Sequence, residues 1–291
     1  MAIQSAYKSV KKSEKSLAVY DELLTRWPVP YRTKVVMTQF GETHVMISGS
    51  PQAKPLVLLH GAATNSTMWI YNIAALSKKF QVFAVDIIGE PGKSAGTRPS
   101  YQSDGHARWL KEVYAALEIQ EAALCGLSLG GMLAYKFALQ YPESVSSLAL
   151  LAPPLSNPRF SVMYRAILAN LIPTSFFTKY FLNYISASAS QWPEWGVKAF
   201  AIPYQSYKFN FDRVPIITDH ELSQLPANTL ILIGKDEVLC DPNTVAARIR
   251  STAPSIIVDI LSGAKHTLSS DQPDLVNEKL LSFFGFSRDK C

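Results

Sequence analysis

The sequence predicts an α/β protein whose eight strands form a mostly parallel sheet covered by helices on both faces. Short apolar runs alternate with segments of helical spacing along most of the 291 residues. Several runs, such as residues 56–59 and 230–233, are apolar at every position, which is typical of strands buried on both faces. Strand–helix alternation of this kind specifies a parallel sheet between two layers of helices.

The predicted elements follow from these runs in order. Strands are predicted at residues 35–40, 44–47, 56–59, 82–85, 122–125, 147–151, 230–233 and 256–260. Helices are predicted at residues 16–27, 66–76, 104–117, 129–139, 244–250 and 275–284. The first two strands meet at Gly41, which indicates an antiparallel hairpin. Pro28 and Pro30 stop the first helix, because proline lacks the amide donor that a helix requires.

Composition narrows the class of protein. With 48% hydrophobic and 18% charged residues, the chain can bury a full core. The three cysteines are scattered and odd in number, which argues against a disulfide framework and fits a reducing compartment. The polar N-terminus lacks the apolar stretch of a secretory signal, and no run of about 18 apolar residues could span a bilayer. We therefore expect a cytoplasmic protein without a membrane partner.

The formal net charge of +5 raises the question of nucleic-acid binding. Apart from Lys8, Lys11, Lys12 and Lys15 near the N-terminus, however, the basic residues are spread along the chain, and no basic motif is interleaved with aromatics. We expect the N-terminal cluster to be a solvated arm and expect no nucleic-acid partner.

Between residues 153 and 217 the alternation stops. This stretch holds 14 of the chain's 32 aromatic residues, about double its even share. Phe160, Met163 and Leu171 belong to a helical spacing that predicts one apolar face. Pro173 should end that helix and Thr174 should cap the next one.

We interpret residues 153–217, called the inserted segment below, as a helical lid placed after the sixth strand. Residues 1–152 and 218–291 then form the core, with residues 1–30 as an N-terminal helical arm. The aromatics can attach the lid to the core or roof an apolar pocket, and both roles are compatible.

The central motif is Gly126-Leu127-Ser128-Leu129-Gly130. A predicted strand precedes it and a predicted helix follows it. A sharp turn from strand to helix would lift the Ser128 hydroxyl clear of the sheet, and such a turn requires flanking residues without bulk. The first amides of the helix would point toward whatever Ser128 attacks. Ser128 is therefore the predicted nucleophile.

A nucleophilic serine requires a base, and five histidines compete for that role. His266 follows the last predicted strand, at the carboxyl edge where open α/β sheets bind ligands. We expect His44, His106 and His220 to be structural. His60 should shape the loop that presents the Ala62 amide, which together with the Leu129 amide would form an oxyanion hole.

The acid that orients the base should lie in the loop 234–242, because the order serine, acid, histidine accompanies this kind of motif. Asp241 precedes Pro242 and should begin the following helix. Asp236 and Glu237 are neighbours whose side chains must point differently, and spacing alone does not choose between them.

Taken together, these motifs resemble the α/β-hydrolase superfamily, and more closely the carboxylesterase NP (naproxen esterase) group of bacterial esterases. The resemblance covers residues 41–45, 56–62, 66–69, 84–89 and 126–131, resumes at 234–242 and 272–278, and is weakest in the inserted segment. It implies an eight-stranded α/β-hydrolase fold in which Ser128 is the nucleophile, His266 the base and Glu237 the acid. Asp236, beside that acid, departs from the family pattern.

The resemblance implies a serine carboxylesterase that acts on small-molecule esters and needs no cofactor or metal. Thioester, lactone or carbon–carbon bond hydrolysis and perhydrolysis use the same three residues and remain alternatives. Another alternative is a ligand receptor with slow turnover on the same fold. Epoxide hydrolases and haloalkane dehalogenases are disfavoured, because those enzymes carry Asp where Ser128 stands.

Overall fold

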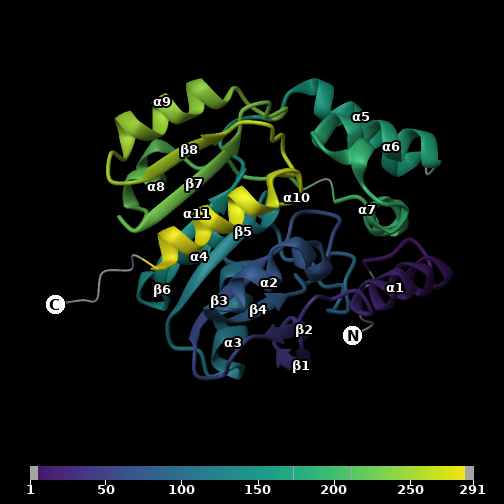
Figure 1. The fold of residues 1–291 in the computed structure, drawn as a ribbon, viewed down its shortest axis with the longest axis horizontal. Helices are drawn as coiled ribbons and strands as arrows, with labels where there is room; N and C mark the ends of the chain where they lie inside the picture. The colour runs from purple at the N-terminus through teal and green to yellow at the C-terminus, as the bar shows by residue number, and fades with distance from the viewer. Residues whose placement is uncertain (1–5, 173, 211, 286–291) are drawn as a thin grey trace.

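The computed structural model describes residues 6–172, 174–210 and 212–285, and it confirms the predicted fold class (Figure 1). Eight strands form one sheet in the order β1-β2-β4-β3-β5-β6-β7-β8. The strands are β1 Tyr31–Thr38, β2 Gly41–Ser48, β3 Lys54–Leu59, β4 Phe80–Val85, β5 Ala122–Leu127, β6 Val145–Leu151, β7 Thr229–Gly234 and β8 Ile257–Leu261. Strand β2 runs antiparallel to both of its neighbours, and all other pairs are parallel.

Helices cover both faces of this sheet. The core helices are α1 Val10–Leu24, η1 Ser66–Tyr71, α2 Ile73–Leu76, α3 Gly105–Ala116, α4 Leu129–Gln140, η2 Pro142–Ser144, α8 Asp219–Gln224, α9 Pro242–Thr252, α10 Leu268–Asp271 and α11 Pro273–Gly285. One hydrophobic cluster joins α3, α4 and α9 to one face of the sheet, and another joins α1, η1 and α11 to the opposite face. The carboxyl ends of β5, β7 and β8, where the predicted site residues lie, therefore belong to a sheet that is packed on both faces.

Two predicted helices differ from the observed ones. The helix predicted at 66–76 is a 3-10 helix, η1, followed by the short helix α2. The break falls at Asn72, whose side-chain amide donates to the Ser269 carbonyl (3.3 Å) and the Asn277 side chain (2.9 Å). These contacts hold Asn72 in place between η1 and α2, where the predicted helix would have been continuous. The first helix, α1, begins earlier than predicted because Ser9 caps it through the Lys12 amide.

The inserted segment contains α5 Phe160–Leu171, α6 Ser175–Ile185, η3 Ala189–Gln191 and α7 Glu194–Ser206. These helices lie together at one end of the sheet, with α1 packed beside α7 (Figure 1). Thr174 caps α6 by accepting from the Phe177 amide, as predicted. Pro173, which was expected to end the preceding helix, lies outside the described residues. The helices share a hydrophobic cluster that also includes Ala63 and Val238 from two core loops.

The apolar spacing predicted for α5 coincides only partly with its buried side. Phe160, Met163 and Leu171 are exposed, and the buried apolar positions are instead Val162 and Ala169. Helix α5 packs against α6 and α7, and its fully buried apolar side chains, Val162 and Ala169, are small. The predicted apolar stripe thus includes exposed residues and also the partly buried Tyr164, Ile167 and Leu168.

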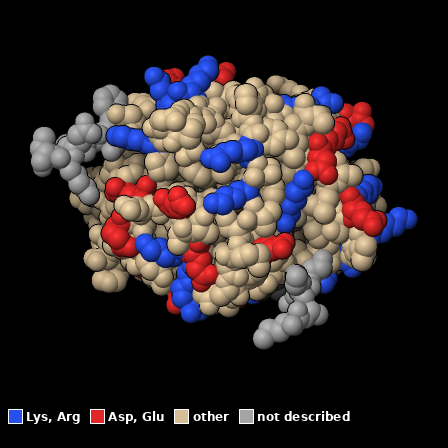
Figure 2. Space-filling view, turned by 90° about the horizontal axis from the view of Figure 1, so that it is seen from below, with Lys and Arg blue, Asp and Glu red and all other residues tan. Residues whose placement is uncertain are grey.

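The surface agrees with the dispersed charge of the sequence. On the face shown in Figure 2, basic and acidic side chains are interspersed, with wide uncharged areas between them. Within the described part of the chain, no helix has both the length and the apolar character needed to cross a membrane.

Candidate active site

Ser128 lies in a strained turn between β5 and α4. Its backbone has φ +52° and ψ −112°, a conformation that a residue with a side chain rarely adopts. A Cβ on Gly126 would lie 2.2 Å from the Gly130 carbonyl oxygen, and a Cβ on Gly130 would lie 2.3 Å from the Leu59 carbonyl oxygen. Both glycines are therefore required by close backbone approach, as the motif predicted. The turn directs the Ser128 side chain toward the carboxyl edge of the sheet.

A continuous chain of hydrogen bonds connects Ser128, His266 and Glu237. The His266 Nε2 atom lies 2.8 Å from the Ser128 Oγ atom. On the other side of the ring, Nδ1 lies 3.0 Å and 3.2 Å from the two carboxylate oxygens of Glu237. A carboxylate only accepts, so Nδ1 carries the proton and Nε2 accepts from the serine hydroxyl. The arrangement leaves the imidazole ready to receive the serine proton.

Glu237 is held in place by its own loop. Its side chain is buried, and Oε1 accepts from the amides of Val238 (2.8 Å) and Leu239 (3.0 Å). Burial alone would raise the pKa of the Glu237 carboxyl, but His266 and these amides outweigh burial and lower the pKa below its usual 4.5. Glu237 is therefore ionised when the site is assembled.

Burial also opposes charge on His266. It would lower the pKa of the imidazole, but the carboxylates of Glu237 and Asp271 outweigh burial and raise the pKa above 6.5. The raised pKa makes His266 a stronger base than an isolated imidazole.

The structure separates the three acidic candidates of the loop 234–242. Asp236 is exposed, and its amide donates to the Ala264 carbonyl at 3.1 Å. Asp241 caps α9 by accepting from the Thr244 amide at 2.7 Å, as predicted. Of the three, Glu237 is the one that contacts His266.

The other four histidines lie apart from Ser128. His60 is fully buried, accepts from the Ile87 amide and hydrogen-bonds the Gly61 carbonyl, each at 2.9 Å, and burial lowers its pKa. His44 lies 3.3 Å from the buried Asp86 carboxylate. His106 is buried in α3, where burial lowers its pKa to about 4, and His220 is exposed in α8. His60 thus braces the loop between β3 and η1, and no other histidine approaches the serine.

Three consecutive amides follow His60. The Gly61 amide donates to the Met68 sulfur (3.3 Å), and the Ala63 amide donates to Glu90 (2.6 Å). Among the described residues, the Ala62 amide between them has no acceptor, and neither does the Leu129 amide at the start of α4. Because Gly130 packs directly on the backbone of Leu59 and His60, the start of α4 lies against the start of this loop. Both amides predicted for an oxyanion hole are thus available to donate to a bound group.

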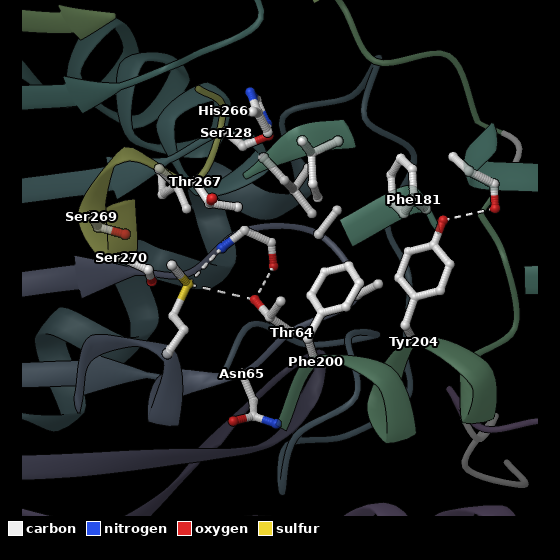
Figure 3. A pocket seen from close by; sticks show the side chains of 18 of the residues that line it. Thr64, Asn65, Ser128, Phe181, Phe200, Tyr204, His266, Thr267, Ser269 and Ser270 are labelled. Carbon is white, nitrogen blue, oxygen red and sulfur yellow. Dashed lines mark hydrogen bonds between the residues drawn. The ribbon is translucent and has the colours of Figure 1, made fainter. Parts of the chain in front are cut away.

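A cavity of about 350 Å³ opens beside Ser128 and His266. Phe181, Phe200 and Tyr204 of the inserted segment lie on the opposite side of this cavity from Ser128 (Figure 3). Thr267 lies near Ser128 in the same view, and Thr64, Ser270, Met68 and Leu129 also line the wall. Over the described ranges, no group of three or more His, Cys, Asp or Glu side chains could hold a metal ion. Most of the side chains that line the cavity are apolar, so its wall is largely apolar.

Two buried carboxylates near this site were missed by the sequence reasoning. Glu90, in the loop after β4, is 2% exposed and binds the Ala63 amide and the hydroxyl groups of Tyr207 (3.1 Å) and Tyr101 (3.4 Å). Burial is the main reason that its pKa is raised to about 7. Asp271 lies five residues after His266 and contacts both its loop and the inserted segment. In the sequence, Glu90 could have been noticed as an acidic residue shortly after a predicted strand. Asp271 could have been noticed as an acidic residue five positions after the predicted base.

Such a sheet, with a strained serine turn and a histidine after the last strand, is that of an α/β hydrolase. In agreement, the family described as alpha/beta hydrolase fold matches residues 54–174. The chain is 37% identical to the uncharacterized carboxylesterase nap of Bacillus subtilis (strain 168), covering 91% of this chain and 90% of that protein. It is 30% identical to carboxylesterase YbfK of the same organism, covering 95% and 96%.

A solved structure supports the same relationship. The crystal structure of naproxen esterase (carboxylesterase NP) from Bacillus subtilis matches with a TM-score of 0.86 and 34% identity, covering 95% of this chain and 99% of that chain. This chain therefore belongs to the α/β-hydrolase family and, within it, to the carboxylesterase NP group.

Proposed function

We propose that this protein is a serine carboxylesterase that uses Ser128, His266 and Glu237 as its catalytic triad. The observation that carries the proposal is the hydrogen-bonded chain of these three side chains at the mouth of an apolar cavity. The names of the relatives in the carboxylesterase NP group support ester hydrolysis as the reaction.

In the first half of the proposed reaction, Ser128 Oγ attacks the ester carbonyl carbon while His266 Nε2 takes the hydroxyl proton. Glu237 holds the tautomer in which Nδ1 carries its proton, and it stabilises the imidazolium that forms. The amides of Ala62 and Leu129 donate to the oxyanion of the tetrahedral intermediate. His266 then protonates the leaving alcohol, which leaves an acyl group on Ser128.

In the second half, water replaces the alcohol. His266 removes a proton from the water as it attacks the acyl carbon, and the same two amides stabilise the second oxyanion. Collapse of this intermediate releases the carboxylic acid and returns the proton to Ser128. The cycle consumes one ester and one water and releases one alcohol and one acid, and His266 makes every proton transfer.

The aromatic lining of the cavity supports a preference for one class of acyl group. We propose that the inserted segment acts as a lid whose aromatic side chains bind bulky apolar or aryl acyl groups. A cavity of about 350 Å³ falls at the small end of the range typical of small-molecule sites, roughly 300–1,000 Å³. We place this activity in the cytoplasm, on small-molecule esters.

Replacing the proposed nucleophile tests the proposal. Ser128→Ala removes one hydroxyl at a partly buried turn and should leave the circular dichroism spectrum unchanged. We expect kcat for a 4-nitrophenyl ester to fall on the order of 10⁴-fold or more, with the remaining rate supplied by the oxyanion donors and binding. A serine-directed phosphonate should label Ser128 in the parent protein. A label on a different serine, or near-normal activity of the variant, would refute the assignment.

Turnover number distinguishes an esterase from a receptor of the same fold. An esterase releases 4-nitrophenol steadily over many turnovers per protein. A receptor with slow turnover would release about one equivalent and stall, because the acyl group would remain on the serine.

A further inference from the structure

Asp271, the last residue of α10, joins the loop that carries His266 to the inserted segment. Its carboxylate is only 7% exposed. On one oxygen, Oδ1, it accepts from the Ser186 hydroxyl (2.6 Å), the Ala187 amide (3.0 Å) and the Ser188 amide (3.1 Å). On the other oxygen, Oδ2, it accepts from the Lys265 amide (3.0 Å). One side chain thus connects the residue before His266 to the turn after α6.

The backbone makes the same connection. The amides of His266 (3.0 Å) and Thr267 (3.3 Å) both donate to the carbonyl of Ile185, the last residue of α6. The Thr267 hydroxyl lies 3.2 Å from Asp271 Oδ1. The position of His266 is therefore set partly by a segment that lies about 80 residues earlier in the chain.

A buried carboxylate is costly unless donors surround it, and here the donors come from both parts that it joins. Because both oxygens are used, an amide in place of the carboxylate would turn its nitrogen toward at least one N–H or O–H donor. The charge also matters, since it lies close enough to His266 to favour the imidazolium.

We propose that Asp271 is a positioning residue for His266, which holds the base by fastening its loop to the turn 186–188 of the inserted segment. The inference rests on the proposed function, because it assigns a task to His266 as the base. The inserted segment is then part of the framework of the site, and kcat depends on contacts made far from Ser128.

The test compares Asp271→Asn with two matched variants. Asp274→Asn removes the same charge from an exposed position in the first turn of α11 and serves as the control. The double variant Ser186→Ala, Ser188→Ala removes two hydroxyls that donate to Asp271 Oδ1, at 2.6 Å and 2.9 Å, but keeps the Asp271 charge. Circular dichroism and melting temperature are measured for all three before the kinetics are interpreted.

For Asp271→Asn we expect kcat to fall about 10- to 100-fold with KM within about threefold of the parent, because misplacement of a catalytic group by about 1 Å can cost that much. The acid limb of the kcat/KM profile should move to lower pH, since one of the two carboxylates that raise the pKa of His266 is gone. The serine double variant should lower kcat and leave that limb in place. Asp274→Asn should change neither quantity.

An NMR titration of the His266 ring provides a readout that does not depend on catalysis, with the signal assigned by its loss in His266→Gln. The inference is overturned if Asp271→Asn matches Asp274→Asn in kcat and in the pKa of His266. If Asp271→Asn does not fold, the serine double variant decides, and an unchanged kcat there overturns it. If Ser128→Ala keeps its activity, the proposed function itself is wrong. An inactive Ser128→Ala beside a normal Asp271→Asn rejects the positioning role alone.

Discussion

The neighbouring acids Asp236 and Glu237 offer the sharpest test of the proposed triad. Glu237→Gln changes one oxygen into an amide nitrogen without changing the shape of the side chain. Because Oε1 accepts from the amides of Val238 and Leu239, the glutamine oxygen should take this place. The new NH₂ group then replaces Oε2, which lies 3.0 Å from His266 Nδ1.

Two donors cannot face each other at this distance, so the imidazole must adopt the other tautomer. Nδ1 then accepts from the glutamine, and Nε2 carries its proton toward Ser128 Oγ, which is 2.8 Å away. A ring in this state cannot take the serine proton. Replacing the acid of other triads by its amide costs about 10⁴ in kcat, and we expect a loss of about 10³–10⁴ here. This loss corresponds to roughly 4–5.5 kcal/mol of activation free energy.

The matched control is Asp236→Asn, which removes the same charge from the adjacent residue. The Asp236 side chain is exposed, so its loss should change kcat less than about tenfold. Steady-state hydrolysis of a 4-nitrophenyl ester gives kcat for both variants, after circular dichroism has shown that both are folded. A larger loss in Asp236→Asn than in Glu237→Gln would refute the reasoning and make Asp236 the acid.

Two further predictions concern the cavity and Glu90. Along acetate, butyrate and arylpropionate esters of one alcohol, kcat/KM should rise, because each methylene buried against the aromatic wall contributes roughly 0.8 kcal/mol; a steady fall with size would mean that the inserted segment closes the pocket. Glu90 has a pKa raised from 4.5 to about 7, so the folded state binds this proton more tightly than the unfolded state, and its contribution to stability falls as pH rises from about 4.5 through 7. Glu90→Gln, which resembles the protonated acid, should therefore gain melting temperature relative to the parent between pH 5 and pH 8 by calorimetry. A difference that does not vary with pH would contradict this prediction.

Much of the fold and of the core of the site could be predicted from the sequence, because each signal is local. Apolar runs of strand length specified all eight strands to within a few residues, and the glycines around Ser128 report a close backbone approach that the structure shows. The position of His266 follows from its place just after the last strand. Choosing between Asp236 and Glu237 required either the family resemblance or the coordinates, since both lie in the same loop.

What could not be predicted depends on partners distant in the chain. The spacing in α5 marks an apolar stripe but does not tell which of its residues α6 and α7 cover. The 3-10 helix η1 is separated from α2 by contacts of Asn72 with residues near the C-terminus. Glu90 and Asp271 resemble ordinary loop acids in the sequence, and they become notable when Tyr207 and Ser186 are brought against them.

Glu90 and Asp271 limit which residues of the inserted segment can be exchanged to change the substrate range. Glu90 binds Tyr207, directly after α7, and Asp271 binds Ser186, directly after α6, so each fastens the inserted segment to a loop of the core. Phe181 and Phe200, which the segment presents to the cavity, are not among these anchors, whereas Tyr207 both lines the cavity and binds Glu90. Under the proposed function, exchanging Phe181 or Phe200 should therefore change which esters are preferred while the base and the oxyanion loop stay in place. Exchanging the anchors should instead lower the rate with every ester. The family resemblance is weakest in the inserted segment. Its cavity-lining residues can thus be exchanged, provided that the contacts of Glu90 and Asp271 are kept.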